Sequence, residues 1–540
     1  MDVIEIKDTN QQMYTLVKNG FFGRLDKVAI SYMGKQIKAS DFFMEVDLWA
    51  EILRNTYGIK KGDVVAMNLP NIPNAIILFY AMNKCGAVAN IMHPFLPAKT
   101  VVKLMEKTNT KMFFAFDTFY KENEEVLREG FKGEIVTASV SDYLPIVKKL
   151  IYSQKEPKLN KSVTQYAKVL SKHKGLKESF SCESHRVTVY MHSAGTSGEP
   201  KVVVLSNYAL NELSKALTYV IPNMDVDHNK CITVMPLFHG FGFGVCMHAM
   251  LSHGFEIILI PRFTPKEMIK VTHKRKATIC AGVPILFKKL LDLSDKNFKK
   301  LFSLEHMFVG GDKLSAELKE EFDTRVKSLG GDAELTEGYG LTETVTVCCV
   351  NLKGEKQNTS MGPPLRGISF KIIDEEGNVL PTNTNGEICV AGPTLMDGYL
   401  GDKEGNSFIY IDNEKYVNTG DIGFLDEEGK LHFIDRKKRI FKVSGITIFP
   451  SEIESTIKKV KSVKDCITIQ ENRKIIAFVE SANTDVEGLR DTILEVCKEN
   501  LIPYAIPKAH NIVIVSKFPK TVVGKTNIQE LTKLIPKPTE

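Results

Sequence analysis

The sequence predicts an α/β protein with a large first domain and a small second one. At 540 residues, the chain is too long for a single hydrophobic core. Continuous apolar runs of strand length, such as Val64–Pro70 and Glu256–Pro261, alternate with longer segments of helical period. Strands that are apolar throughout are covered on both faces, as in sheets that lie between helices. We therefore expect layered α/β subdomains over most of the chain.

The pattern changes toward the C-terminus. The short runs Cys466–Gln470 and Ile475–Val479 precede a segment of helical period over Val486–Asn500, which predicts an α+β unit rather than more α/β layers. We place a domain boundary before this part of the chain. The expected domains are residues 1–437, made of α/β subdomains, and residues 438–540, a small α+β domain.

The composition is that of an ordinary globular protein. Hydrophobic residues make up 43% of the chain and charged residues 25%, as in most globular domains. No apolar run reaches the roughly 18 residues that a membrane-spanning helix needs. The N-terminal segment MDVIEIKDTNQQ carries acidic residues and no apolar core, so we expect no secretion signal and a cytoplasmic location.

Cysteine spacing and charge exclude several classes of protein. The ten cysteines show no C-x-x-C spacing, and their apolar neighbours indicate buried, reduced thiols rather than a zinc site or a disulfide framework. The formal net charge of +6 is spread over the whole chain, and no motif that reads nucleic acid is present. We expect no nucleic-acid partner.

The most informative segment is Tyr190–Asn207, with the sequence YMHSAGTSGEPKVVVLSN. Glycines let a backbone approach an anion closely, hydroxyls donate hydrogen bonds and a lysine adds positive charge. The residues of these kinds are Ser193, Gly195, Thr196, Ser197, Gly198 and Lys201. The spacing is not that of a Walker loop, because Lys201 follows Pro200. The segment predicts a phosphate-binding loop, although an ordinary turn between two strands has a similar composition.

Six further segments follow in order along the chain. They are PLFHGFG (Pro236–Gly242), GGDKL (Gly310–Leu314), EGYGLTET (Glu337–Thr344), YVNTGD (Tyr416–Asp421), DRKKRIFKVSG (Asp435–Gly445) and PKTVVGKT (Pro519–Thr526). Together with the loop, they resemble the motifs of the adenylate-forming superfamily, which contains acyl-CoA synthetases, aryl-CoA ligases, luciferases and peptide-synthetase adenylation domains. The resemblance runs from about Asp26 to Glu530.

This resemblance implies a two-step reaction. A carboxylate attacks the α-phosphate of ATP to give an acyl-adenylate and pyrophosphate, and a thiol, usually that of coenzyme A, then displaces AMP. Both reactants of the first step are anions, so positive charge and hydrogen-bond donors must neutralise the phosphoryl oxygens. In the superfamily a small, mobile C-terminal domain rotates between the steps, about a hinge that corresponds to Lys438 here.

The resemblance also assigns the contacts with the phosphates. Thr196, Ser197, Gly198 and Lys201 would hold the β- and γ-phosphates of ATP. In the EGYGLTET segment, Thr342 would donate to the α-phosphate, and Glu343 would bind Mg²⁺, a cation that prefers carboxylate and phosphate oxygens. Each of these residues taken alone is compatible with a solvated or capping role.

The nucleoside would be held by a different set of residues. Tyr339 would stack on the adenine, with Gly311 and Asp312 at the edge of the base. Asp421 would accept hydrogen bonds from the ribose hydroxyls, and Arg436 would contact the same sugar. A core tyrosine and an aspartate that caps a turn are the plainer alternatives.

The remaining assignments concern the acid and the thiol. Lys525 would bridge the attacking carboxylate and an α-phosphate oxygen in the first step. Lys442, Ser444 and Gly445 would approach the thiol in the second step. His239 would form a gate and a wall of the carboxylate site, although a lone histidine is more often a core residue.

The motifs leave the acid open. Glycine alternates with phenylalanine from Gly240 to Gly244. The glycines would leave apolar walls suited to a medium- or long-chain fatty acid, or they serve only close packing of the backbone. An aryl or bile acid is an alternative. An adenylation enzyme that loads an amino acid onto a carrier protein would need an acidic residue near Phe238, and none occurs through Cys246. A regulator without catalysis would have lost the charged residues named above, and a luciferase would need a specialised substrate.

One segment is unusually basic. Residues 148–177 contain nine lysines and a single acid, Glu156. Apolar residues recur at helical spacing around its start, at Leu144, Val147, Leu150 and Ile151. A solvated basic face is one interpretation. Peripheral contact with an anionic membrane, from which a lipid substrate is collected, is the other, and long-chain fatty acyl-CoA synthetases often resemble the chain in this segment.

Overall fold

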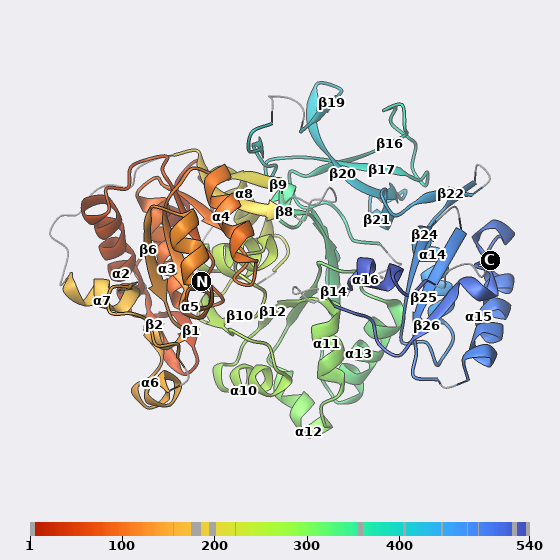
Figure 1. Ribbon diagram of the computed structural model, residues 1–540, viewed down its shortest axis with the longest axis horizontal. Helices are drawn as coiled ribbons and strands as arrows, with labels where there is room; N and C mark the ends of the chain where they lie inside the picture. Colours follow the sequence, from red (N-terminus) through yellow and green to blue (C-terminus); the bar gives the residue numbers. More distant parts are fainter. Residues whose placement is uncertain are drawn as a thin grey trace. The chain divides into compact units, whose positions relative to one another are not determined.

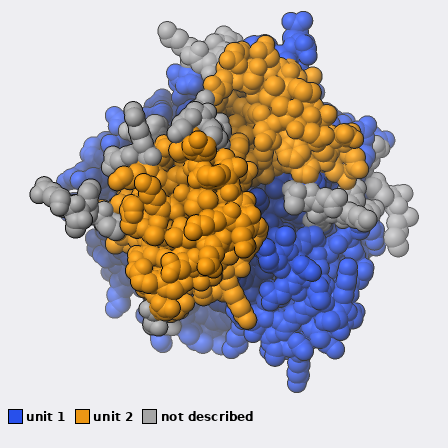
Figure 2. Space-filling view, turned by 90° about the vertical axis from the view of Figure 1, so that its right-hand side faces the viewer, with its two compact units in different colours: residues 1–370, 390–417 blue, residues 371–389, 418–540 orange. Residues whose placement is uncertain are grey.

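The chain forms two compact units in a computed structural model. The structure describes residues 6–154, 156–173, 185–193, 201–221, 223–354, 360–402, 407–443, 446–471, 474–483, 485–520 and 526–535. Unit 1 comprises residues 1–370 and 390–417, and unit 2 comprises residues 371–389 and 418–540 (Figure 2). The expected boundary after residue 437 lies inside unit 2, and it stays a prediction.

Unit 1 contains an eight-stranded sheet of order β18-β9-β8-β4-β3-β5-β6-β7. Its strands are β3 (Val64–Met67), β4 (Val88–Ile91), β5 (Thr110–Phe116), β6 (Glu134–Ala138), β7 (Thr164–Gln165), β8 (Val187–Ser193), β9 (Lys201–Ser206) and β18 (Gly398–Tyr399). The strands from β7 to β8 pair in parallel, and β9 and β18 are added antiparallel at one edge.

A second eight-stranded sheet has the order β15-β14-β13-β12-β10-β11-β1-β2. Its strands are β1 (Val28–Tyr32), β2 (Lys35–Lys38), β10 (Lys230–Thr233), β11 (Glu256–Leu259), β12 (Ile279–Gly282), β13 (His306–Val309), β14 (Leu335–Tyr339) and β15 (Cys349–Val350). The central pairs are parallel and both edge pairs are antiparallel.

Helices cover these two sheets (Figure 1). They are α1 (Met13–Gly20), α2 (Ala39–Glu51), η1 (Ile52–Thr56), α3 (Pro73–Lys84), α4 (Ala98–Lys107), α5 (Asp117–Gly130), η2 (Val140–Tyr143), α6 (Ile146–Ser153), α7 (Tyr166–Lys172), α8 (Asn207–Leu217), η3 (Phe241–Ala249), α9 (Met250–Ser252), α10 (Pro265–Arg275), α11 (Pro284–Leu291), α12 (Asp295–Phe298), η4 (Lys299–Leu301), α13 (Ala316–Ser328) and η5 (Thr342–Thr344). Every residue of α3 is buried, so this helix lies in the interior of unit 1.

The remaining strands form smaller sheets. Strands β16 (Ser369–Ile373), β17 (Gly386–Ala391), β20 (Glu414–Leu425) and β19 (Ile409–Ile411) follow one another in that order, and β21 (Leu431–Arg436) pairs with β20. The others are the pair β22 (Phe441–Val443) and β23 (Ile446–Ile448), and the sheet of β24 (Asp465–Glu471), β25 (Lys474–Glu480) and β26 (Ile512–Val515). The accompanying helices are α14 (Pro450–Lys458), α15 (Val486–Asn500), η6 (Pro503–Ala505), η7 (Ala509–Asn511) and α16 (Ile528–Thr532). Apolar residues of α14 and α15 pack on β24–β26 in one core cluster.

The elements confirm the predicted α/β class and several predicted segments. The α+β pattern at the C-terminus corresponds to β24, β25 and α15, and α15 has the predicted bounds. The nine cysteines within the described ranges are buried free thiols, as expected. Among the same residues, no helix has both the length and the apolar character needed to cross a bilayer.

The π-helix η3 forms where glycine alternates with phenylalanine. All of its residues are buried. A Cβ atom added at Gly242 would lie 2.2 Å from the carbonyl oxygen of Pro236, so only glycine lets the helix pack this close to the loop before it. On the other side, Phe243 meets Phe79 of α3 edge to face, with 4.6 Å between the ring centroids. The helix is therefore fixed on both sides.

His248 fixes the far end of η3. Its Nδ1 lies 3.1 Å from the Tyr80 hydroxyl of α3, and its Nε2 lies 2.9 Å from the Asn211 Oδ1 of α8. Burial lowers the pKa of His248 from its ordinary value of 6.5 to about 3. The imidazole is therefore neutral at pH 7, accepting from Tyr80 and donating to Asn211, and it joins three helices.

We expect acid to destabilise unit 1 through His248. Because the pKa of His248 is lower in the folded protein, the unfolded chain binds the proton more tightly, and the free energy of unfolding falls as the pH drops below 6.5. The loss amounts to about 2 kcal/mol at pH 5. His248→Gln should therefore lose about 2 kcal/mol less than the parent protein between pH 7 and pH 5 in denaturant titrations. His510→Gln, at an exposed site, is the control, and equal acid losses in all three proteins would contradict the assignment.

Candidate active site

The structure describes part of the predicted site. Six of the predicted residues lie outside the described ranges, namely Thr196, Ser197, Gly198, Ser444, Gly445 and Lys525. For Lys442 the structure describes only its place in β22. The described site residues of unit 1 are Lys201, His239, Gly311, Asp312, Tyr339, Thr342 and Glu343, and those of unit 2 are Asp421 and Arg436.

Two antiparallel strands close the phosphate-loop segment. Strand β8 ends at Ser193 and β9 begins at Lys201, and these two residues are opposite each other in the ladder. The register brings both ends of the intervening segment together and places Lys201 at its exit. His192, one residue earlier, donates from Nε2 to Asn90 Oδ1 at 2.7 Å, and burial lowers the pKa of His192 to about 4. His192 is therefore neutral at pH 7, and Lys201 supplies positive charge at this end of the ladder.

Lys201 and Glu343 are connected through Tyr399, a residue that the sequence analysis missed. The Lys201 Nζ lies over the Tyr399 ring, 4.1 Å from its centroid, a favourable cation–π geometry. The Tyr399 hydroxyl donates to Glu343 Oε1 at 2.9 Å. Burial and the neighbouring Glu343 carboxylate raise the pKa of Tyr399 well above its usual range, so the phenol remains a donor. One aromatic side chain thus orients both the cation and the carboxylate.

The position of Tyr399 follows from strand pairing. Strand β18 adds to β9 with Tyr399 opposite Val203. Two oxygens of Asp397 accept from the Arg186 guanidinium at 2.9 and 2.6 Å, and the Met396 amide donates to the Glu343 carbonyl at 2.8 Å. This role of Tyr399 could not be identified from the sequence. Strand β18 is very short, and its partner strand β9 is distant along the chain.

The turn that carries Thr342 and Glu343 has an unusual backbone. Val345 has φ 68° and ψ −53°, and the Thr346 amide donates to the Thr344 carbonyl at 2.9 Å across it. These angles and this bond define a rare, strained γ-turn. Positive φ is uncommon for a β-branched residue and is found where the surroundings enforce it, often at functional sites.

Packing against the start of η3 enforces this turn. Val345 is fully buried. A Cβ atom at Gly240 would lie 2.2 Å from the Val345 carbonyl oxygen, and one at Gly244 would lie 3.1 Å from the Val345 Cγ1. The two glycines therefore make room for the turn. His239, just before η3, is exposed and its Nδ1 accepts from the Phe241 amide at 3.2 Å.

The segments predicted to hold adenine lie at the carboxyl ends of two neighbouring parallel strands. GGDKL follows β13 and Tyr339 ends β14, with Val309 opposite Glu337 in the ladder. Such strand ends form the usual ligand crevice of open α/β sheets. Gly311 has φ 79°, a conformation that favours glycine, and Asp312 is exposed next to it.

The buried carboxyl group of Glu337 holds the GGDKL loop in place. Glu337 Oε1 accepts from the Leu314 amide at 2.7 Å, which ties the GGDKL loop to β14. Burial raises the pKa of Glu337 to about 7.

In unit 2, the structure brings Asp421 and Arg436 together as adjacent members of one ladder. They are opposite each other on β20 and β21, and the Arg436 Nε lies 3.6 Å from Asp421 Oδ1. Asp421 is buried, whereas two thirds of the Arg436 side chain is exposed. A buried carboxylate next to an exposed guanidinium is suited to accept hydrogen bonds from a polar ligand. Lys437 and the expected hinge residue, Lys438, follow directly.

Comparisons with known proteins identify the family of the chain. The family model described as AMP-binding enzyme matches residues 22–400, and that of the AMP-binding enzyme C-terminal domain matches residues 452–525. The chain is 29% identical over 523 residues to a long-chain-fatty-acid–CoA ligase of Bacillus subtilis, covering 93% of this chain and 90% of the relative. It is 25% identical over 481 residues to 4-coumarate–CoA ligase 1 of Arabidopsis thaliana, covering 87% and 82%.

Solved structures show the same fold. An anthranilate CoA ligase, AuaEII, in complex with anthranoyl-AMP superimposes with a TM-score of 0.79 at 20% identity, covering 98% of each chain. ATP-bound MatB from Rhodopseudomonas palustris gives 0.80 at 21% identity, covering 96% of this chain and 98% of that one. Fold and motif order together define an adenylate-forming enzyme. The chain belongs to the AMP-binding enzyme family.

We expect Tyr399→Phe to weaken binding of Mg–ATP by roughly tenfold, because it removes a hydrogen bond to a charged group while keeping the ring beneath Lys201. Tyr399→Leu should weaken binding further, since it also removes the ring. Isothermal titration calorimetry measures both affinities. Tyr410→Phe, at an exposed tyrosine, is the matched control. Unchanged affinity in Tyr399→Phe would show that the phenol does not orient Glu343.

Proposed function

We propose that the protein is an ATP-dependent acid–CoA ligase that acts on a medium- or long-chain fatty acid. The acid carboxylate attacks the α-phosphorus of ATP, the bond to the pyrophosphate leaving group breaks, and an acyl-adenylate forms. The sulfur of coenzyme A then attacks the acyl carbon and AMP leaves. The support is the family membership together with the Lys201–Tyr399–Glu343 arrangement at the exit of the phosphate loop.

Glu343 is suited to Mg²⁺ that arrives with the nucleotide. Its carboxylate is half-buried and Tyr399 holds one oxygen. Among the described residues, no group of three or more histidine, cysteine, aspartate or glutamate side chains could hold a metal ion alone. Mg²⁺ commonly takes one or two carboxylates and completes its shell with substrate phosphates and water. The proposed ion would supply charge neutralisation at the phosphates, while Lys201 and Thr342 donate to the same oxygens.

The proposed nucleoside contacts follow the strand ends described above. Tyr339, with Gly311 and Asp312, would hold the adenine, and Asp421 with Arg436 would hold the ribose. The aspartate accepts the hydroxyl protons, and the arginine limits the movement of the sugar. These roles need no rearrangement within either unit, because each pair of segments is already joined by a strand ladder.

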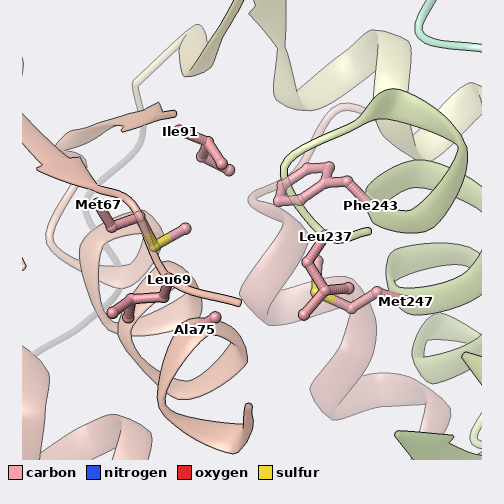
Figure 3. Close-up of a pocket in the computed structure, with 7 residues that line it drawn as sticks. All are labelled: Met67, Leu69, Ala75, Ile91, Leu237, Phe243 and Met247. Carbon is pink, nitrogen blue, oxygen red and sulfur yellow. The ribbon is translucent and has the colours of Figure 1, made fainter. Parts of the chain in front are cut away.

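A small apolar cavity between the start of α3 and η3 is the proposed entry point for an alkyl chain. It has a volume of about 10 Å³ and is lined by Met67, Leu69, Ala75, Ile91, Leu237, Phe243 and Met247 (Figure 3). The lining carries no charged side chain. Its two methionines have flexible, unbranched side chains that repack easily. We propose that an alkyl chain enters here and displaces them. An aryl acid is the alternative, since several relatives are 4-coumarate–CoA ligases.

The second step would use another face of the C-terminal domain. Lys525 is proposed to bridge the carboxylate and the α-phosphate in the first step. Rotation about Lys438 would then bring Lys442, Ser444 and Gly445 to the thiol, with the domain boundary between residues 437 and 438. Such a movement separates the half-reactions, so that water is excluded while each of them proceeds.

The experiment that tests the function is mass spectrometry of the purified protein with Mg–ATP and a panel of acids. The panel runs from acetate through octanoate and palmitate to aryl, bile and amino acids, with and without coenzyme A. Acyl-CoA that forms only with coenzyme A, from an aliphatic acid, is the expected result. An acyl-adenylate that never transfers to coenzyme A would indicate another acceptor, such as a carrier protein.

Two lysine variants should separate the half-reactions. We expect Lys525→Ala to lower the rate of acyl-adenylate formation by more than about a hundredfold, because it removes the charge between two anions. Thioester formation from supplied acyl-adenylate should be spared. Lys442→Ala should show the reverse pattern. Single-turnover assays of each step measure both rates, and equal losses in both steps would refute the assignment of Lys525.

Filling the cavity should shift the chain-length preference. Ala75→Leu adds a branched side chain at the cavity wall, so kcat/KM for palmitate should fall by about tenfold or more relative to hexanoate. The activity with the shorter acid serves as an internal standard for folding. Ala167→Leu, at an exposed alanine of α7, is the control. An unchanged palmitate-to-hexanoate ratio would show that the chain does not reach this cavity.

A further inference from the structure

Helix α6 is labelled in the ribbon diagram (Figure 1), and its apolar face is exposed to solvent. The exposed fractions are 80% for Ile146, 71% for Val147, 66% for Leu150 and 61% for Ile151. The spacing i, i+1, i+4 and i+5 places all four on one side of the helix. Single exposed apolar residues are ordinary on a protein surface, whereas a contiguous group marks an interaction site.

The base of α6 is anchored, so its exposed face has a fixed position in unit 1. Ser139 and Asp142 form a capping box on η2, directly before α6. Asp142 also accepts from the Asn74 amide of α3 at 2.9 Å. The Lys148 Nζ donates to the Met33 carbonyl at 2.6 Å, which ties α6 to the turn between β1 and β2. The helix is thus held on its polar side.

The surroundings of this face are basic. Lys149 is exposed on α6, and Lys35 is exposed just after the turn that Lys148 contacts. The acids that flank the helix in sequence, Asp142 and Glu156, are hydrogen-bonded within unit 1 to Asn74 and Ser139. Further exposed lysines follow along the chain, at Lys158, Lys161, Lys168 and Lys172.

We propose that α6 docks the protein on a bilayer that contains anionic lipids. The four apolar side chains enter the boundary between headgroups and acyl chains, and the lysines meet the anionic headgroups. Charge complementarity selects this partner. A second copy of the chain would bring the same lysines into opposition, and two helical turns offer far less than the ~800 Å² per partner of a stable protein interface. The inference goes beyond the proposed reaction and does not depend on which acid is used.

The test is co-sedimentation of the full chain with phosphatidylcholine vesicles that do or do not contain roughly one-third phosphatidylglycerol. The apolar variant is Leu150→Ser with Ile151→Ser, and the charge variant is Lys35→Glu with Lys149→Glu. Ile285→Ser, at an exposed apolar residue of α11, is the matched control. Thermal unfolding and activity on octanoate, which dissolves without vesicles, are measured for every protein.

We expect the parent protein and the control to bind the anionic vesicles. The apolar variant should bind more than about tenfold more weakly, and the charge variant should lose the preference for anionic lipid, as added salt should also do. Unfolding temperature and octanoate activity should not change. Equal binding by the parent protein and the apolar variant would overturn the proposal, as would self-association that the variants abolish in the absence of lipid. Lack of ligase activity would refute the proposed function and leave the vesicle result intact.

Discussion

The active site depends on the contact between the turn after Glu343 and the start of η3. Val345 adopts a backbone conformation that costs of the order of 1–3 kcal/mol, and it is retained because Gly240 and Gly244 leave the space that it fills. This contact therefore fixes two segments at once, the turn after Glu343 and the start of η3, which have different proposed roles. One carries the carboxylate proposed for the metal, and the other carries His239 and the wall of the apolar cavity.

The strand edge formed by β9 and β18 supplies the second constraint. A ladder is a rigid means of bringing distant segments together, because each backbone hydrogen bond fixes both strands. Here it places Tyr399 between Lys201 and Glu343. A flexible lysine and a flexible glutamate are thereby oriented by one aromatic ring, which loses little conformational entropy when it is buried. The charges proposed to face the phosphates are thus already oriented by Tyr399.

Local patterns predicted much of this molecule. The buried strands, the α+β end and the bounds of α15 followed from periodicity, and the motif order indicated the family, now confirmed. Tyr399 could not be predicted, because its role arises from pairing between strands that are distant in sequence. The strained backbone at Val345 could not be predicted either, because nothing in the local sequence around Thr342–Val345 favours a positive φ at a valine. The roles of Lys525 and Lys442 stay predictions.

The glycines of η3 also restrict how substrate preference can evolve. A side chain at Gly240 would collide with the Val345 carbonyl oxygen of the carboxylate turn, and one at Gly242 with the carbonyl oxygens of Met235 and Pro236, so the backbone on the η3 side of the cavity is fixed. The opposite wall, from β3, β4 and the start of α3, meets the cavity through side chains such as Met67 and Ile91. Because Leu237, Phe243 and Met247 line the η3 side, substrate preference can change through side-chain exchanges on either wall, while the glycines that hold the backbone are kept.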